Sequence, residues 1–243
     1  MSRIEAKDRL IVALDLPDVE AAKRMVEKLE GTVFFKVGLS LQLAPGVEDL
    51  IGSLIAKNKK VFLDYKYYDV PETVKKAVSQ AARLGVSFLT IHGTSDIIQA
   101  AMNGKKGSNL KLFTVTVLTS MESSDLAEMG YVSTTVEEMV LFRARKALEA
   151  GSDGVISSGR EAKKIKELAG NKLLVVTPGI RPEGYPEDDQ KRKVTPTEAV
   201  LAGADYLVIG RPITDEVDPG KAAQEILSQM QRAFDRIAQP VTS

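Results

Sequence analysis

The sequence predicts a (β/α)8 barrel. Short apolar segments alternate with amphipathic helical segments along all 243 residues, and eight strand–helix pairs can be counted. The apolar segments are continuous instead of alternating with polar residues, as in parallel strands that are covered on both faces. The length also suits a barrel of this type. A doubly wound open sheet has the same alternation of elements and is the alternative fold.

Each predicted strand is a short apolar run that ends in polar or turn-forming residues. In order, the predicted strands are Leu10–Leu14, Val33–Val37, Lys60–Asp64, Phe88–Ile91, Leu112–Val117, Gly154–Ile156, Leu173–Thr177 and Tyr206–Ile209.

The predicted helices carry apolar residues on one face. Pro71 suits a first helical turn, and Gly85 and Gly151 suit helix ends. No linker or change of composition interrupts the chain, so we predict one domain over residues 1–243, with a frayed tail at 237–243. The helices are expected at Val19–Leu29, Val47–Lys57, Glu72–Leu84, Ile97–Met102, Val136–Ala150, Arg160–Leu168, Pro196–Ala202 and Pro219–Arg236.

Composition excludes several classes of function. The chain has 33 basic and 33 acidic residues, so no net charge favours nucleic acid or an anionic membrane. There is no cysteine, hence no disulfide and no thiolate metal site. No apolar run approaches the roughly 18 residues of a membrane span, and the charged N-terminus lacks the apolar part of a signal peptide. We therefore expect a cytoplasmic protein.

Three charged residues follow the apolar run Val61–Leu63 with D-x-K-x-x-D spacing: Asp64, Lys66 and Asp69. Residues two apart on a strand point to the same face, so Asp64 and Lys66 are expected side by side. In a barrel that face is the interior, where an isolated ion is costly. Two carboxylates beside one ammonium indicate a charge array for catalysis. A salt-bridged strand end on the surface is the alternative.

Single polar residues also follow most of the other predicted strands. Barrel enzymes carry their active sites in the loops after the strands, so these residues are candidates for one site. The set comprises Asp15, Lys36, His92, Thr119, Ser120, Arg181 and Arg211.

A phosphate site is predicted after the last two strands, where barrels often bind phosphate. Gly210 allows close approach of the backbone, and Arg211 offers a planar fork of donors. The long polar loop from Gly179 to about Val194 carries Arg181 and Gln190, and we interpret it as a lid. An ordinary exposed loop is the alternative.

Simpler roles are open for several candidates. Asp15 could cap the next helix, Lys36 could form a buried ion pair, and Thr119 and Ser120 could form a strand-end turn. His92, the only histidine, is interpreted as structural. One histidine and no cysteine leave little for a transition-metal site, although carboxylates could hold Mg²⁺.

Along nearly its whole length the chain resembles the orotidine 5′-monophosphate decarboxylase family. The matching segments occur in the order typical of that family. They are Ala13-Leu14-Asp15, Phe35-Lys36-Val37-Gly38, Leu63 to Pro71, Val115 to Ser120, Thr177-Pro178-Gly179-Ile180-Arg181-Pro182, Asp189-Gln190, Thr195-Pro196 and Val208 to Ile213.

The resemblance implies decarboxylation of orotidine 5′-monophosphate to UMP without a metal or organic cofactor. Lys66 would stabilise the carbanion and donate the proton, with Asp64 and Asp69 completing the array. Lys36 is the fourth catalytic residue that the resemblance implies, and it would pair with Asp64 and reach the ribose. It implies a homodimer in which Asp69 and Thr73 reach the site of the neighbouring subunit. The implied substrate contacts come from Asp15, Lys36, Asp64, Thr73, Thr119, Ser120, Arg181, Gln190, Gly210 and Arg211.

The chain departs from the family pattern at a few positions. Tyr68 stands where the family usually has His, Glu72 where it has Asn, and Gly93–Asp96 replaces a Gly pair. None of these removes a charged catalytic position. Two alternatives stay open: a Mg²⁺-dependent sugar-phosphate decarboxylase or aldolase-type relative that shares D-x-K-x-x-D, and a non-catalytic phosphate-ligand binder.

Overall fold

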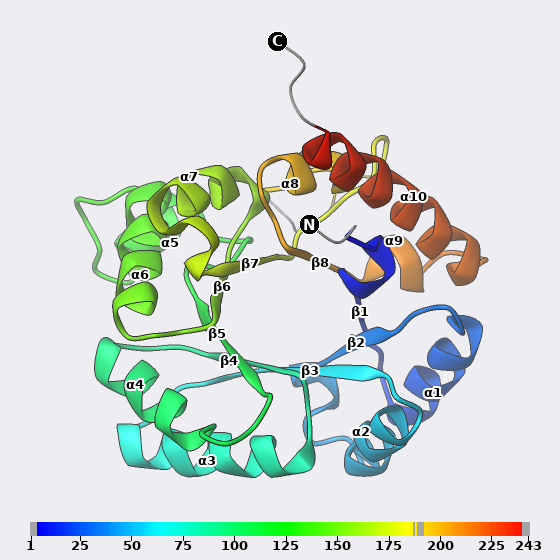
Figure 1. The fold of residues 1–243 in the computed structure, drawn as a ribbon, viewed down its shortest axis with the longest axis horizontal. Helices are drawn as coiled ribbons and strands as arrows, with labels where there is room; N and C mark the ends of the chain where they lie inside the picture. Colours follow the sequence, from blue (N-terminus) through cyan, green and yellow to red (C-terminus); the bar gives the residue numbers. More distant parts are fainter. Residues whose placement is uncertain (1–3, 187, 189–191, 240–243) are drawn as a thin grey trace.

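The structure is a computed structural model that describes residues 4–186, 188 and 192–239, and it forms a closed barrel of eight parallel strands (Figure 1). The strands pair in chain order, and β8 closes the ring by pairing with β1. This closure confirms the (β/α)8 prediction over the open sheet. The strands are β1 (Leu10–Ala13), β2 (Phe34–Gly38), β3 (Lys60–Tyr67), β4 (Phe88–Ile91), β5 (Lys111–Val115), β6 (Gly154–Ile156), β7 (Leu174–Thr177) and β8 (Tyr206–Ile209).

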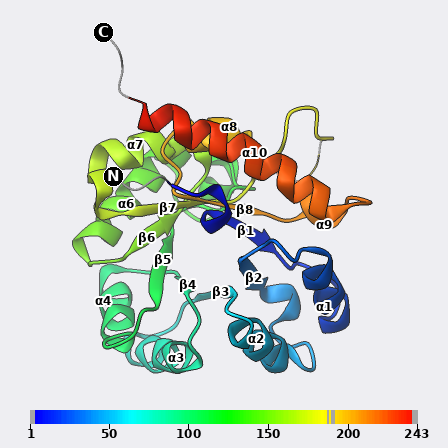
Figure 2. The same ribbon diagram turned by 45° about the vertical axis from the view of Figure 1, so that its right-hand side comes forward.

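The helices surround the barrel, as the turned view shows (Figure 2). Among the described residues, no helix has the length and apolar character needed to cross a membrane. The α-helices are α1 (Val19–Lys28), α2 (Val47–Ala56), α3 (Pro71–Leu84), α4 (Ser95–Gly104), α5 (Ser123–Glu128), α6 (Val136–Glu149), α7 (Gly159–Ala169), α8 (Pro196–Leu201), α9 (Arg211–Thr214) and α10 (Pro219–Ala238). Three 3-10 helices are η1 (Ala6–Asp8), η2 (Leu39–Leu41) and η3 (Gly170–Lys172).

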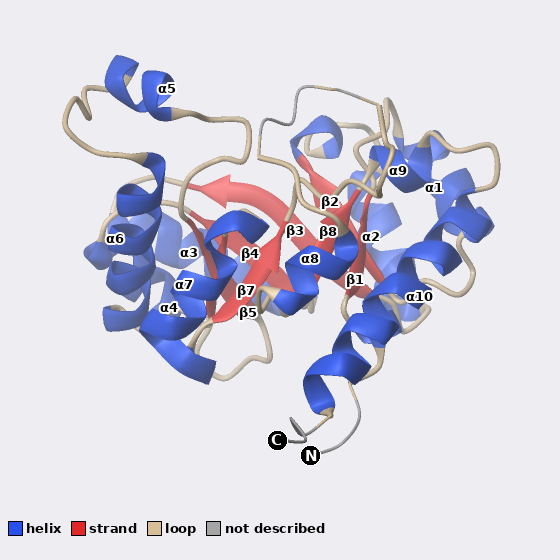
Figure 3. Cartoon of the chain, turned by 90° about the horizontal axis from the view of Figure 1, so that it is seen from above, coloured by secondary structure: helices blue, strands red, loops and turns tan. Residues whose placement is uncertain are grey.

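The two helices that the sequence pattern missed are both short. Helix α5 lies at the periphery, beyond the end of β5 (Figure 3), and α9 directly follows β8. Neither is long enough to show a helical period of apolar residues. The tail predicted from residue 237 is wrong at its start, because α10 continues to Ala238; residues 240–243 lie outside the described part.

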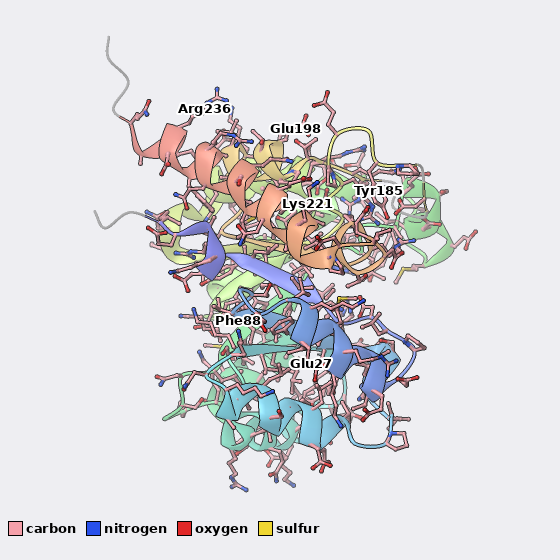
Figure 4. All side chains as sticks on the ribbon, turned by 90° about the vertical axis from the view of Figure 1, so that its right-hand side faces the viewer. Glu27, Phe88, Tyr185, Glu198, Lys221 and Arg236 are labelled. Carbon is pink, nitrogen blue, oxygen red and sulfur yellow. The ribbon has the colours of Figure 1, made fainter. Side chains whose placement is uncertain are left out.

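Two apolar layers hold the barrel together. The interior is filled by phenylalanines from neighbouring strands, with Phe34 and Phe88 packed edge to face at 4.8 Å between ring centroids. The outer layer lies between the strands and the helices. Figure 4 shows Phe88 inside and charged side chains such as Glu27 and Lys221 on the outer helices. Because the aromatic filling closes the barrel, the site has to lie above it.

Candidate active site

A cavity of about 510 Å³ lies at the C-terminal ends of the strands. Its floor is apolar, with Phe62, Val115 and Val208 among its residues, and its walls are polar. This volume is typical of a small-molecule site. Nine of the twelve predicted site residues line it: Asp15, Lys36, Asp64, Lys66, Thr119, Ser120, Arg181, Gly210 and Arg211.

The Asp64–Lys66 pair is built on an irregular end of β3. The strand continues through Tyr67 instead of ending at Asp64 as predicted, and its register with β4 shifts between Leu63 and Tyr67. Lys66 has a left-handed backbone with φ of 48°. The irregularity turns the lysine toward its neighbour, and Lys66 Nζ lies 2.9 Å from Asp64 Oδ1. The predicted side-by-side placement is confirmed, but through a bulge and not through regular strand alternation.

Thr90 of β4 stabilises this bulge and was not singled out from the sequence. Its hydroxyl accepts a hydrogen bond from the Lys66 backbone N–H at 2.9 Å and donates one to Asp64 Oδ1 at 3.0 Å. A left-handed non-glycine residue costs roughly 1–2 kcal/mol, and the Thr90 bonds offset part of that cost. The only sequence signal was one hydroxyl within an otherwise apolar strand.

Lys36 links this pair to Asp15. Its buried ammonium donates to both oxygens of Asp15, at 2.8 and 3.0 Å, and lies 3.5 Å from Asp64 Oδ2. The pair with Asp64 that the resemblance implies is therefore present, and Asp15 lies closer still. Gly38 makes room for it, because a Cβ there would lie 2.8 Å from both Asp15 Oδ1 and Lys36 Nζ. The capping role considered for Asp15 is wrong, since Asp18 caps α1.

The four side chains form a row of alternating charge, Asp15–Lys36–Asp64–Lys66. Burial alone would raise the pKa of Asp64, but Lys36, Lys66 and the hydrogen bonds lower it overall. The Asp64 carboxylate is therefore ionised at neutral pH. Such a row can hold an ammonium group in fixed position beside a reacting atom without requiring a net charge.

Two arginines converge on one carboxylate at the opposite wall. Arg181 donates to Asp188 Oδ2 from Nε at 2.8 Å and from Nη2 at 2.5 Å, and Arg211 Nη2 lies 3.2 Å from the same oxygen. Lys193 Nζ lies 3.6 Å from Asp188 Oδ1. This wall therefore holds three cationic side chains around one carboxylate, and guanidinium groups pair well with carboxylate or phosphate. Gln190, also predicted here, lies outside the described residues.

Asp69 and Thr73 are not brought into the cavity. Both are exposed, and Asp69 Oδ1 accepts a hydrogen bond from the N–H of Val70 at 2.6 Å. Within this chain Asp69 therefore does not complete the charge array. The structure describes one subunit, so the expected contribution to a neighbouring site stays a prediction.

His92 does not line the cavity. Its ring packs edge to face on Tyr68, with 5.4 Å between centroids. Burial lowers the pKa of His92, and Arg143 lowers it further, so the imidazole is neutral at pH 7. These contacts support the structural interpretation.

Replacing His92 by glutamine is accordingly expected to leave kcat within about threefold of the wild-type value. Because the pKa is lowered, His92 changes charge below its ordinary range, and the pH profile between pH 6 and 8 should be the same in both proteins. Steady-state kinetics across that range check this. A general base contributes about 10²- to 10⁴-fold, so a loss of that size would make His92 catalytic.

The described residues contain no group of three or more His, Cys, Asp or Glu side chains arranged to hold a metal ion. The charged groups of the cavity are instead paired as acid with base.

The fold and the cavity define a (β/α)8 barrel whose upper rim joins a row of alternating charges to a pair of arginines on one carboxylate. A model of the orotidine 5′-phosphate decarboxylase / HUMPS family matches residues 8–226, and the chain belongs to that family. The resemblance noted from the sequence motifs is thereby confirmed.

Several relatives cover nearly the whole chain. A protein of Nitrobacter winogradskyi named orotidine 5′-phosphate decarboxylase is 52% identical over 230 residues, covering 94% of this chain and 95% of its own length. A protein of the same name from Methylococcus capsulatus is 50% identical over 233 residues, covering 95% of both. The crystal structure of orotidine 5′-phosphate decarboxylase from Lactobacillus acidophilus has a TM-score of 0.81 at 36% identity and covers 94% of this chain and 99% of its own.

Proposed function

We propose that this protein decarboxylates orotidine 5′-monophosphate to UMP, the last step of de novo pyrimidine nucleotide synthesis. The single observation that carries the proposal is one cavity that contains both the row ending in Lys66 and the arginine pair at Asp188. The family membership and the relatives' names support it. The proposed partner is the nucleotide alone, with no nucleic acid or membrane, and the proposed location is the cytoplasm.

In the proposed reaction the bond between C6 of the pyrimidine and its carboxylate breaks. CO2 leaves, and the electron pair stays on C6. The Lys66 ammonium stabilises this negative charge and then transfers a proton to C6, giving UMP; the neutral amine regains a proton from water. A fixed ammonium on an apolar floor interacts strongly with such a charge because little water screens it.

The other residues of the row would hold Lys66 and the ribose. Asp64 binds the ammonium at 2.9 Å and would lie beside the departing carboxylate. Lys36 and Asp15 form the part of the row farther from Lys66, and we assign them to the ribose hydroxyls. Thr119 and Ser120 are assigned to the ribose and the polar edges of the base.

The phosphate would bind between Arg181 and Arg211, in place of the Asp188 carboxylate, with Gly210 and Gln190 also assigned to it. Two guanidinium forks offer a phosphate dianion several charge-assisted hydrogen bonds at once. Binding there holds the pyrimidine over Lys66.

A spectrophotometric assay of orotidine 5′-monophosphate loss, with and without EDTA, tests the proposal. The proposed mechanism takes its positive charge from Lys66, so activity is expected to survive exhaustive chelation unchanged. Activity that stops with EDTA and returns with added Mg²⁺ would favour the sugar-phosphate relative. No conversion at all would favour the phosphate-ligand binder.

We further propose a homodimer with composite active sites. Asp69 and Thr73 are exposed on the segment after β3, and the flanking side chains of Tyr68 and Val70 are 67% and 63% exposed. Large exposed apolar side chains beside an exposed carboxylate are typical of an interaction surface. A twofold axis close to this surface would bring Asp69 of each subunit to the partner's Lys66.

Mixing two inactive variants tests the dimer. Lys66→Ala and Asp69→Ala are each expected to be inactive, and their mixture should regain activity. In a hybrid dimer one of the two sites receives both intact residues, so random exchange yields at most about a quarter of wild-type activity. Size-exclusion chromatography with light scattering gives the oligomeric state. A monomer at assay concentration, or no recovery after confirmed subunit exchange, would contradict the dimer.

A further inference from the structure

Arg192 is a buried arginine that does not line the cavity. It lies in the loop after β7 and is 5% exposed. Its Nη1 donates to both oxygens of Glu161 on α7, each at 3.0 Å. Burial raises the pKa of Glu161, and Arg192 opposes that shift. Removing two charges from water has a large desolvation cost, so a buried ion pair of this kind is weak evidence for a contribution to stability. We therefore consider a role for Arg192 other than stabilising the fold.

The other nitrogen of the fork contacts the backbone beneath the predicted pyrimidine site. Nη2 donates to the carbonyls of Leu118 at 2.9 Å and Val117 at 3.2 Å. Both residues lie beyond the end of β5, outside the strand ladder, and the Leu118 carbonyl also accepts from the Met121 backbone N–H at 3.0 Å. Both also line the cavity and lead directly into Thr119 and Ser120. Arg192 therefore fixes the segment that carries two candidate substrate contacts.

The same arginine is tied to the loop that carries the anion site. Ser158 donates from Oγ to the Arg192 carbonyl at 3.2 Å, and two residues later Val194 O accepts from the Arg181 backbone N–H at 2.9 Å. Arg181 is one of the two arginines at Asp188. One planar group thus joins the phosphate side of the cavity to its pyrimidine side. A lysine could not make this set of contacts, because its three donors lack the planar fork.

We propose that Arg192, held by Glu161, is a positioning residue that sets Thr119 and Ser120 against the phosphate-binding loop. The proposal rests on the proposed function, since it concerns alignment of base and phosphate in one nucleotide. It assigns Arg192 no contact with the substrate. Substitution of Arg192 or Glu161 is therefore expected to weaken binding of ligands that contact both loops. Ligands that contact only the phosphate side should keep their affinity.

The test compares wild type with Arg192→Lys and Glu161→Gln, using calorimetric affinities for UMP and inorganic phosphate together with kcat and KM. Arg192→Lys is expected to weaken UMP binding about tenfold and to lower kcat at least as much, because small misplacements near reacting atoms are costly. Affinity for inorganic phosphate, which needs only the phosphate side, should stay within about twofold. Glu161→Gln, which keeps an oxygen acceptor, should change the ratio of the two affinities about fivefold.

Lys164→Gln is the matched control. Lys164 lies on α7, as Glu161 does, and the substitution breaks its half-exposed ion pair with Glu137 of α6. It should change neither affinity nor kcat. Thermal unfolding establishes that each variant is folded at the assay temperature. A merely structural role would lower Tm without changing the ratio of the two affinities. If Arg192→Lys leaves both the ratio of the two affinities and kcat unchanged, the proposal is overturned. If that variant does not fold, an unchanged ratio of affinities in Glu161→Gln overturns it instead. A wild type that does not decarboxylate would instead defeat the proposed function.

Discussion

Replacement of Lys66 by alanine is expected to reduce kcat by about 10⁴-fold or more. The substitution removes two contributions at once. A preorganised positive group at a developing charge contributes about 10²- to 10³-fold, and a positioned proton donor contributes about 10²- to 10⁴-fold. No other described ammonium can take over, because Lys36 is bound to both oxygens of Asp15. Single-turnover measurement of orotidine 5′-monophosphate loss gives the residual rate.

The fold and the phosphate contacts should survive this substitution. Lys66 is only partly buried and is held chiefly by Asp64, so UMP affinity is expected to stay within about tenfold of wild type. Lys60→Ala is the matched control, because it removes a lysine at the opposite end of the same strand and should leave kcat unchanged. Near-normal turnover in Lys66→Ala would contradict the role given to this residue.

Removal of the neighbouring carboxylate is expected to be severe for a different reason. Asp64→Ala leaves Lys36 and Lys66 without the group that lies between them, so the two cations repel each other. Slower turnover together with tighter binding of an anionic product-like ligand would be consistent with this. The two effects can be separated by measuring kcat and UMP affinity in the same variant.

The sequence was sufficient for the barrel and for most of the cavity because both depend on local patterns. Apolar runs predict the strands, and the polar residues that follow them predict the rim. Asp15, Lys36, Thr119 and Arg211 are therefore predicted at one end of the barrel, where they line the cavity. Barrel enzymes have their active sites at the C-terminal ends of the strands, so residues that follow different strands in the sequence are expected to lie close together in space.

The sequence was insufficient where contacts between strands decide the conformation. The left-handed Lys66 and its bond to Thr90 depend on a register shift between β3 and β4, which no pattern within either strand reveals. The pair of Lys36 with Asp64 is present, but for a similar reason the closer contact of Lys36 with Asp15 was not predicted. The choice between Asp15 and Asp64 depends on the space above Gly38, which only the assembled barrel defines.

Arg192 and Asp188 were missed because they lie in a loop whose other residues had more obvious roles. In the sequence Asp188 is one of several acidic residues near Gln190, and Arg192 is one cation in Lys191-Arg192-Lys193. What distinguishes Arg192 and Asp188 from the residues next to them in the sequence is burial. Arg192 is 5% exposed, and Asp188 contacts two arginines. Burial of loop residues is a tertiary property, so composition and spacing do not predict it.

Arg211→Ala is expected to lower kcat/KM about 100-fold, corresponding to about 2.7 kcal/mol of transition-state stabilisation. The loss should appear in kcat as well as in KM. Binding energy from a group remote from the reaction helps to hold C6 against Lys66, and a substrate held less firmly spends less time in the reactive geometry. Arg181 would remain, but a single fork leaves part of the phosphate charge unpaired.

Activity on orotidine, which lacks the phosphate, separates this effect from a general disturbance of the site. If Arg211 acts through the phosphate, Arg211→Ala should lower activity on the nucleotide and leave the much smaller activity on the nucleoside unchanged. The difference between the two substrates then measures the interaction of Arg211 with phosphate, as in a double-mutant cycle. Equal losses on both substrates would mean that the substitution disturbs the cavity through Asp188, which Arg211 contacts at 3.2 Å. Unchanged kinetics on the nucleotide would contradict the assignment of this wall to phosphate, because no other pair of described arginines converges on one acceptor in the cavity.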